Sequence, residues 1–401
     1  MANTFINGKK IKLFAAAVKN TAPYLEASKS YFAGDIEGKK NGQTYYTYIS
    51  DPGVATSGVD ITSDDRSNVQ KQVAVTLRNM KQGVDLSTLN RTVDIESFAE
   101  EVAKPLGQTI GAQVQKEVVE RTILTTDGAI VTTAAAFKTL GSLAAKLRGV
   151  KAAGKITGWF HPEDASDIIA SGLGVFQAPT EYAKQSFGDA SVGRFASTDW
   201  NEIPEIPAYT MGSFIPSTTT TMTSTITADG VVSFGLTDAA ITTASNIKVG
   251  TIINFAGVKT LTLNNMVTQE QYSAIVTADA TGTAGAITVT VNPIYFAKGA
   301  AKNVSVTSIA AGTKCVASGQ VAGSTYRVIQ ARDNDALAFD TYKFAALPSA
   351  EEMSESVGKF KIEGCAIGNV LTRDATYRFD FPYAAEMVQS KLNRIAFVLV
   401  A

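Results

Sequence analysis

Apolar and polar residues alternate in two segments near the start of the chain. Residues 44 to 49 carry three tyrosines, Tyr45, Tyr46 and Tyr48. Residues 69 to 77 place apolar side chains on alternate positions, with one polar gap at Lys71. Alternation of this kind predicts two half-buried strands. A two-stranded arm is not stable alone in water, so these strands must lie on their own domain or on a neighbouring subunit.

Apolar residues then recur at three- and four-residue steps from Asp94 to Leu124, which predicts a long amphipathic helix. Pro105 is expected to kink or restart that helix, because proline removes a backbone donor. Gly107 and Gly111 lie four residues apart and leave a smooth strip. Another backbone could approach this strip closely.

The next segment alternates helix and strand patterns. We expect a helix from Thr133 to Leu147, a strand from Lys155 to Phe160, and a second helix that begins at Pro162. This alternation indicates an α+β or α/β core domain over residues 133 to 213.

The character of the chain changes from Phe214 to about Arg327, a Thr-rich span with only ten charged residues. Strand-like runs follow one another there, separated by glycine and asparagine. Their spacing predicts a small β-barrel or sandwich. The expected strands are Val231–Phe234, Ile247–Phe255, Thr260–Leu263, Ala286–Val291 and Val304–Ile309. Residues 336 to 401 return to longer strands.

Residues 1 to 33 hold five lysines and one acid, with little periodicity. This composition is typical of an arm rather than a core element, although a frayed terminus would look the same. Three of the lysines are close together, at Lys9, Lys10 and Lys12.

Lys and Arg total 36 and Asp and Glu total 37, so the formal net charge is -1. Without a basic stripe, sequence-specific binding of nucleic acid is disfavoured. Neither a signal peptide nor a membrane-spanning run is expected. The two cysteines, Cys315 and Cys365, are expected to be free buried thiols.

Residues that could carry out chemistry are scarce. His161 is the single histidine, and no nucleophile motif accompanies it. The segment from Gly149 to Lys155 matches most of a phosphate-binding loop, but Ile156 replaces the required Ser or Thr and the order of helix and strand is reversed. We therefore expect no catalytic residues, no metal and no cofactor.

Two stretches resemble a known family. Residues Lys248 to Val258 read Lys-Val-Gly-Thr-Ile-Ile-Asn-Phe-Ala-Gly-Val, which is similar to the inserted domain of the coat protein of short-tailed Salmonella phages, with Thr251 where Asp is usual. Residues 192 to 207 resemble a tailed-phage major capsid protein through Gly193, Ala196, Trp200, Ile206 and Pro207.

The resemblance implies an α+β fold of the Hong Kong 97-like capsid type, with an inserted small β-barrel. Its expected parts are an N-terminal arm (1–33), an extended two-stranded loop (34–80), a peripheral domain with a spine helix (81–132), an axial domain (133–213), the inserted domain (214–330) and a return segment (331–401). The expected subunit-contact residues are Lys9, Lys10, Lys12, Tyr45, Tyr46 and Tyr48.

The function that the resemblance implies is self-assembly into an icosahedral shell around double-stranded DNA, with pentamers and hexamers of the chain itself. A scaffolding protein and a portal protein are the implied partners, and the virion capsid is the implied location. Three alternatives stay open: a phage tail or adhesin protein, a cellular nanocompartment shell, and an enzyme of unknown type.

Overall fold

The computed structural model describes residues 2–31, 41–49, 70–86, 102–172, 192–297, 301–317, 319–344, 351–368 and 375–400. It divides the chain into two compact units, each assembled from separate segments. Unit 1 comprises Met1–Thr47, Val73–Val119 and Leu337–Val388, and unit 2 comprises Tyr48–Gln72, Glu120–Ala336 and Gln389–Ala401.

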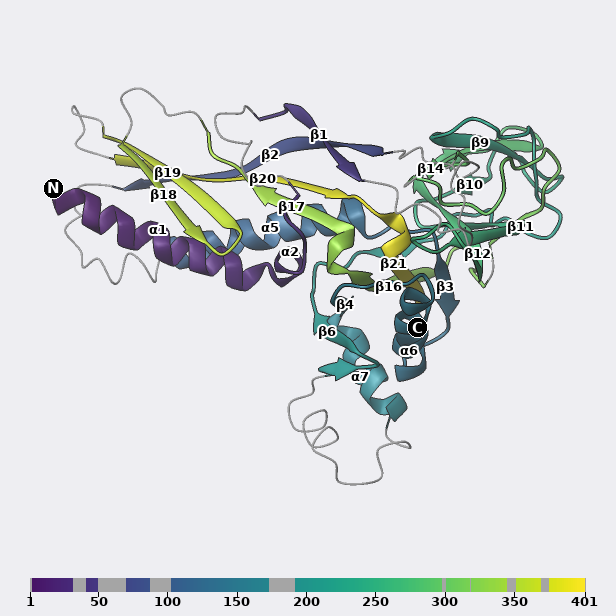
Figure 1. Cartoon of the computed structure of the whole chain (residues 1–401), viewed down its shortest axis with the longest axis horizontal. Helices are drawn as coiled ribbons and strands as arrows, with labels where there is room; N and C mark the ends of the chain where they lie inside the picture. Colours follow the sequence, from purple (N-terminus) through teal and green to yellow (C-terminus); the bar gives the residue numbers. More distant parts are fainter. Residues whose placement is uncertain are drawn as a thin grey trace, which may run out of the picture. The chain divides into compact units, whose positions relative to one another are not determined.

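Unit 1 is built on a six-stranded antiparallel sheet with the order β1-β2-β20-β19-β18, in which β17 also pairs with β20 (Figure 1). The first two strands confirm the two predicted from the alternating pattern, although β2 continues well past Leu77. The strands are β1 (Thr44–Ile49), β2 (Lys71–Leu86), β17 (Leu337–Thr341), β18 (Glu351–Val357), β19 (Phe360–Gly368) and β20 (Ala375–Met387).

Helix α1 (Ala2–Thr21) packs on the sheet of unit 1, followed by the short α2 (Pro23–Glu26). The composition predicted an arm rather than a core element, whereas α1 contributes buried side chains to the core of unit 1. Ile11, Phe14 and Val18 are buried, and the Phe14 ring stacks on Phe379 with centroids 4.6 Å apart. The helix therefore gains its stability from tertiary packing of a narrow apolar stripe.

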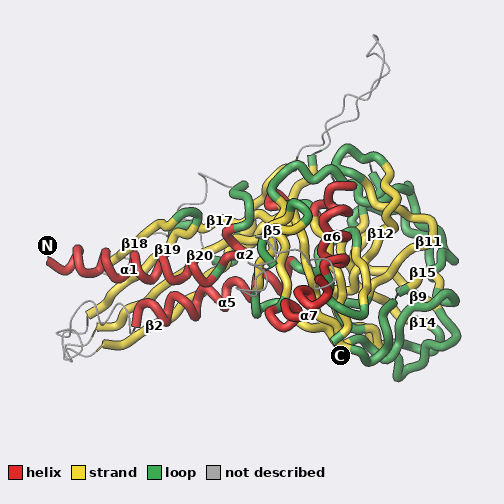
Figure 2. The backbone as a smooth tube through the Cα atoms, turned by 90° about the horizontal axis from the view of Figure 1, so that it is seen from below, coloured by secondary structure: helices red, strands yellow, loops and turns green. Residues whose placement is uncertain are grey.

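Helix α5 (Lys104–Thr122) runs beside α1, as Figures 1 and 2 show. A Cβ atom at Gly107 would lie 2.7 Å from the Phe14 carbonyl oxygen, and one at Gly111 would lie 3.0 Å from that of Val18. The predicted strip for close backbone approach is thus confirmed. Residues 102 and 103 are π-helical and the α-helix begins at Lys104, so the helix changes type beside Pro105, in line with the expected kink or restart. Residues 94 to 101 of the predicted helix lie outside the described residues.

Unit 2 contains a seven-stranded mixed sheet with the order β3-β21-β16-β4-β6-β5, in which β7 also pairs with β16. Helices α6 (Phe137–Gly149) and α7 (Pro162–Gly172) accompany it and confirm two predicted helices, with α6 beginning four residues later than expected. The strands are β3 (Ala129–Thr132), β4 (Ile156–Phe160), β5 (Arg194–Phe195), β6 (Thr198–Glu202), β7 (Ala208–Thr210), β16 (Thr325–Asp333) and β21 (Asn393–Leu399). The short 3-10 helices η2 (Asn334–Ala336) and η3 (Ser390–Leu392) complete the unit.

The β5–β6 hairpin turns on Ala196 and Ser197, which have φ of 52° and 61°. Two successive positive φ angles define the turn that matches the twist of a two-residue hairpin. Trp200, on β6 of this hairpin, covers Gly158, where an added Cβ atom would overlap its ring. Two residues of the 192–207 resemblance therefore have local structural roles.

The inserted domain is a second six-stranded sheet with the order β15-β11-β12-β14-β9-β8, accompanied by the small β10–β13 ladder. A bridge between Thr221 and Lys314 joins its two ends, so the sheet closes on itself. The strands are β8 (Thr221–Met222), β9 (Val231–Thr237), β10 (Asn246–Ile247), β11 (Ile252–Leu261), β12 (Val267–Ala278), β13 (Ala280–Thr281), β14 (Ala286–Ile294) and β15 (Cys315–Val316). The predicted inserted β-barrel, and with it the α+β class, is confirmed.

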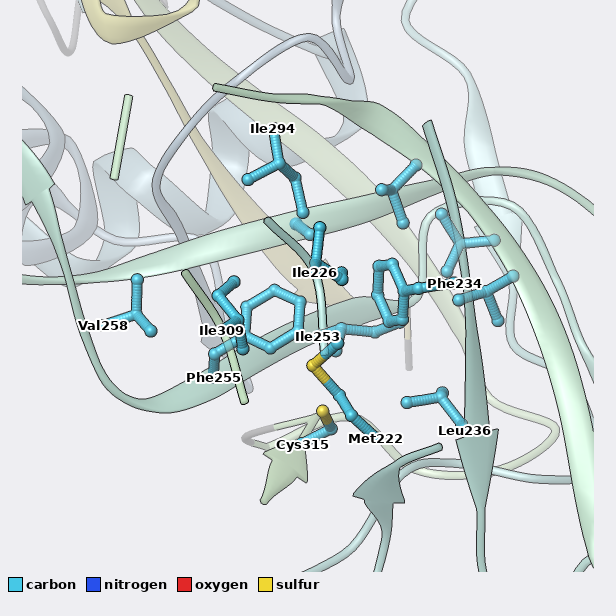
Figure 3. Packing of buried hydrophobic residues seen from close by; sticks show 14 of the residues in the cluster. Met222, Ile226, Phe234, Leu236, Ile253, Phe255, Val258, Ile294, Ile309 and Cys315 are labelled. Atoms are coloured by element: carbon cyan, nitrogen blue, oxygen red, sulfur yellow. The ribbon is translucent and has the colours of Figure 1, made fainter. Parts of the chain in front are cut away.

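The barrel interior is apolar (Figure 3). Phe255 lies at its centre, with ring centroids 5.3 Å from Phe234 and 6.2 Å from Tyr272. The predicted strand at Val304–Ile309 is wrong, since its two ends make only isolated bridges, and Thr260–Leu263 is not a separate strand because β11 runs through Leu261.

The chain enters and leaves the barrel through neighbouring strands. Thr210 at the end of β7 is the register partner of Thr325 at the start of β16, and their hydroxyl oxygens are 2.9 Å apart. The Met211 N–H donates to the Ser324 carbonyl at 2.9 Å. Residues 211 to 324 are therefore an insertion into an otherwise continuous antiparallel pair.

The α1–α5 packing predicts the effect of Gly107→Ala. In an isolated helix this change would stabilise by about 1 kcal/mol. Here the added methyl meets the Phe14 carbonyl, and we expect a net loss of about 1–3 kcal/mol in the free energy of unfolding. Chemical denaturation measures it. Gly149→Ala at the end of α6 is the control, since nothing lies within 4 Å of a Cβ there. Equal unfolding free energies for the two variants would contradict the close packing.

Candidate subunit-contact surfaces

Strand β1 carries the predicted tyrosines and forms one edge of its sheet. Tyr46 and Tyr48 point to the same side of the strand and are 54% and 59% exposed, whereas Tyr45 points to the other side and is half-buried. Burial, together with the nearby Asp340 carboxylate, raises the pKa of Tyr45 well above its ordinary value. The strand therefore anchors through Tyr45 and presents two aromatic rings to solvent.

The predicted lysines lie on α1. Lys9 and Lys10 belong to the helix, and the side chain of Lys12 is exposed beside Leu13, which is 44% exposed. Exposed large apolar residues are few among the described residues. A lysine next to an exposed leucine gives this side of α1 both charge and apolar area.

The sequence did not predict an ion-pair cluster that joins the inserted barrel to the α6 helix and the seven-stranded sheet of unit 2. Glu270 on β12 accepts from Lys146 on α6 at 2.6 Å and from the Nε of Arg394 on β21 at 2.8 Å. Arg394 is fully buried and Glu270 is 10% exposed. The second guanidinium arm of Arg394 donates to the carbonyls of Lys391 and Asn393.

A second contact between barrel and sheet is centred on Asp127, which is 1% exposed. Its carboxylate accepts from Ser390 at 3.1 Å and from the Asn303 amide at 3.3 Å, and its carbonyl accepts the Ser273 N–H. Burial raises the pKa of Asp127 above its ordinary value of 3.8, although Arg394 and Lys391 oppose the shift.

Further bonds extend this interface along the barrel. The Leu263 N–H donates to the carbonyl of Val150, Lys391 donates to Asn265 at 2.9 Å, and the Asn292 amide donates to the carbonyl of Leu124 at 2.6 Å. The only signal in the sequence was an isolated acid, Glu270, in a charge-poor domain. Its partners are 124 residues away in either direction, so no local pattern identifies them.

Thr251 stands where the motif of residues 248 to 258 usually has Asp. It is buried in the turn before β11. Its hydroxyl donates to the Lys248 carbonyl at 2.7 Å. Gln320 completes the turn by accepting the Ile252 N–H and donating to the Gly250 carbonyl. Thr251 thus closes the bend through its own backbone.

The candidate catalytic histidine and the candidate phosphate-binding loop both have structural roles. The Nδ1 atom of His161 accepts the Glu163 N–H at 3.2 Å, in the first turn of α7. The Gly154 N–H is bonded to the Asp333 carboxylate at 2.8 Å, and a Cβ at Gly154 would overlap that carboxylate. The segment from Gly149 to Lys155 is thus a helix end and a turn before β4.

Both cysteines are buried thiols, as predicted, and neither forms a disulfide in the described part of the chain. Burial raises the pKa of Cys315 to about 12, so its thiol stays protonated at neutral pH. Among the residues that the structure describes, no group of three or more His, Cys, Asp or Glu could hold a metal ion. Within the same residues, no helix is both long and apolar enough to cross a membrane.

The sequence matches no family model and no curated protein. Similar solved structures are the head of Helicobacter pylori bacteriophage KHP40 (8% identity, TM-score 0.47, 94% of this chain and 91% of that chain covered), and the capsid of Ralstonia phage GP4 (7%, 0.46, 93% and 87%). A third is the holo-SrpI encapsulin complex from Synechococcus elongatus PCC 7942 (7%, 0.41, 90% and 85%). At these identities and TM-scores, the likenesses carry no argument about the function of this chain.

The ion-pair cluster predicts a large cost for Glu270→Ala. The substitution leaves Arg394 charged and buried without its carboxylate, which we expect to lower the free energy of unfolding by about 3–5 kcal/mol. Denaturant titration measures the change. Asp199→Ala is the control, because its pair with Lys155 is exposed at 67% and 37% and is worth at most about 1 kcal/mol. Similar losses in both variants would contradict a special role for Glu270.

The raised pKa of Asp127 predicts that the free energy of unfolding depends on pH in a particular direction. Because its pKa is raised on folding, the folded state holds the proton more tightly than the unfolded chain does. Titration of Asp127 therefore lowers the free energy of unfolding as the pH rises from 3.8 through the folded pKa. We expect Asp127→Asn to remove this part of the slope when unfolding free energies are compared with wild type between acidic and neutral pH.

Asp238 is a control for this pH dependence, because its pKa shifts in the opposite direction. Burial raises its pKa, but the Ala240 N–H and the hydroxyls of Thr219 and Thr220 outweigh burial and lower it. Asp238→Asn should therefore lose stability above pH 3.8, and the loss should shrink as the pH falls through the lowered pKa. Slopes of the same sign in both variants would contradict the assignment.

Proposed function

We propose that this protein is the major capsid protein of a tailed bacteriophage. Many copies associate into an icosahedral shell, as pentamers and hexamers, around the double-stranded DNA genome. The chain acts by assembly and is not an enzyme. The observation that carries the proposal is the exposed aromatic face of β1, Tyr46 and Tyr48, on an edge strand of the unit 1 sheet.

The aromatic face supports assembly because it combines two features that monomeric proteins usually limit. An edge strand has unpaired backbone groups, and large exposed rings add apolar area beside them. Tyrosine is enriched at protein interfaces because it offers a rigid apolar body with a polar tip. A neighbouring subunit that covers β1 would bury both rings.

The order of elements gives further support. A basic N-terminal segment, a strand pair, a long helix, an α/β sheet, an inserted barrel and returning strands follow one another. This is the order that the resemblance to tailed-phage capsid proteins implies. The boundaries of the six parts are part of this proposal.

Partners and location follow from the same proposal. A scaffolding protein guides assembly in the host cytoplasm, a portal protein occupies one vertex, and the mature protein resides in the virion capsid. With a net charge of -1, the chain would enclose DNA without reading its sequence. Lys9, Lys10 and Lys12 on α1, and the tyrosines of β1, contribute to contacts between subunits.

The inserted barrel has a proposed role in steadying the subunit. The chain enters and leaves it through the Thr210–Thr325 pair, and Glu270 binds it back onto the sheet. Two separate attachments oppose rotation of the barrel about its own linkers. A nanocompartment shell is the second candidate function, because a shell subunit for cargo enzymes would need the same contact surfaces.

Electron microscopy of the purified chain, alone and co-expressed with a scaffolding protein, tests the proposal. We expect closed shells or tubes of megadalton size. A particle that contains DNA supports the phage capsid, and one that contains a cargo enzyme supports the nanocompartment. A stable monomer of 42.3 kDa under both conditions would overturn both.

The double variant Tyr46→Ser, Tyr48→Ser tests whether the exposed aromatic face of β1 is a contact between subunits. Loss of two buried rings at a contact should raise the concentration needed for assembly at least tenfold, about 1.4 kcal/mol for each subunit. Light scattering measures that concentration. Val232→Ser with Val321→Ser is the matched control, since these residues are 46% and 58% exposed on the barrel. If both double variants assemble as wild type does, the aromatic face is not a contact.

A further inference from the structure

A pocket of about 560 Å³ lies in unit 2, bounded by the segment that leads into α6, by α7 and by the end of β21. It uses none of the residues assigned above to subunit contact or to the barrel interface. Its lining combines acids with apolar side chains, and no sequence motif points to it.

The charges of the pocket do not balance. Glu163, Asp164 and Asp167 contribute three negative charges, and Arg327 contributes one positive charge, which leaves a formal charge of -2. Arg327 is already occupied: its Nε and Nη2 atoms lie 3.0 and 2.9 Å from Asp164 Oδ1, and Nη1 binds Glu163. Asp167 is exposed and makes no salt bridge with any residue in the described part of the chain.

One oxygen of the Asp164 carboxylate lacks a donor, although Arg327 binds the other oxygen. The Asp164 side chain is 1% exposed, and its Oδ2 atom accepts no hydrogen bond from the described residues. A buried carboxylate oxygen without a donor is costly, so a ligand that brings positive charge to this pocket would be stabilised. Asp167 follows three residues later on α7, is exposed and lines the same pocket.

The remaining walls are apolar. Ala134, Ala135 and Ala136 lie on one side, and Leu399 and Val400 lie on another. A cleft with apolar walls and carboxylates suits a lysine, whose methylene stem packs on apolar surface while its ammonium group binds acids. An arginine would need a planar, two-pronged acceptor, and the Oδ1 atom of Asp164 is already shared by Nε and Nη2 of Arg327, so a compact ammonium group fits better.

We propose that this pocket receives Lys12 of a second copy of the chain, with Leu13 covering the apolar rim. The inference rests on the proposed function, since it needs neighbouring subunits. Lys12 and Leu13 are adjacent and exposed on α1, in a segment with five lysines and one acid. That pairing of one ammonium group with one leucine matches the mixed lining of the pocket.

Charge exchange tests the proposal in the full-length chain. Asp167→Lys and Lys12→Glu should each raise the concentration needed for assembly at least tenfold, and the double variant should recover most of the loss. Glu202→Lys is the matched control, because Glu202 is exposed on β6 of the same unit, and it should assemble as wild type does. Single variants that assemble normally, or a double variant without recovery, would overturn the Lys12–Asp167 contact.

Carbodiimide crosslinking of assembled wild-type particles gives a readout that does not depend on the variants folding. It joins a carboxylate directly to a contacting amine, and peptide mass spectrometry should find Lys12 linked to Asp167 or Glu163 in a dimer-sized band. Linkage within one chain, linkage to another lysine, or no linkage would overturn the proposal. If wild type forms no particles at all, the proposed function itself fails, whereas particles without this link leave that function standing.

Discussion

The carboxylate of Glu270 is the constraint on which the arrangement of unit 2 depends. Arg394 is fully buried in β21, and a buried guanidinium without a counter-charge is strongly unfavourable. The inserted barrel supplies that counter-charge from β12, and Lys146 approaches the same carboxylate from α6. The sheet therefore requires the barrel electrostatically, although the barrel has its own apolar core.

This constraint explains how a large insertion can coexist with a regular sheet. The paired residues Thr210 and Thr325 hold the two linkers together, so the sheet closes over the insertion point as if it were a hairpin. The hydrogen bonds of Asp127 and the ion pairs of Glu270 attach the barrel at sites far from the linkers in sequence. Buried polar contacts of this kind specify one orientation, because a shifted barrel would leave each of them unsatisfied.

The proposed contact surfaces differ from this interface in chemistry. The barrel interface is buried and ionic, whereas Tyr46 and Tyr48 on β1 and Lys12 with Leu13 on α1 are exposed and mixed in character. Exposed contacts are individually weak, which suits a shell that must correct errors while it grows. Strong, buried bonds inside the subunit and weak, repeated bonds between subunits are a consistent division for an assembling protein.

The sequence by itself determined the elements whose patterns are local. Alternation identified β1 and β2, three- and four-residue spacing identified α5 and α6, and the glycine pair at Gly107 and Gly111 correctly indicated a close backbone approach. The tyrosines and lysines were also visible, because they cluster within a few residues. These features depend on neighbours along the chain, where periodicity carries the information.

Only the tertiary structure decided the rest. Helix α1 is stabilised by packing, in which the Phe14 ring stacks on Phe379. The barrel closes through a bridge between Thr221 and Lys314. Glu270 forms ion pairs with residues 124 positions away in each direction. The acidic pocket arises where separate segments meet around α7. Each of these depends on burial and on charge balance between distant segments, and neither quantity is encoded in the spacing of residues along one segment.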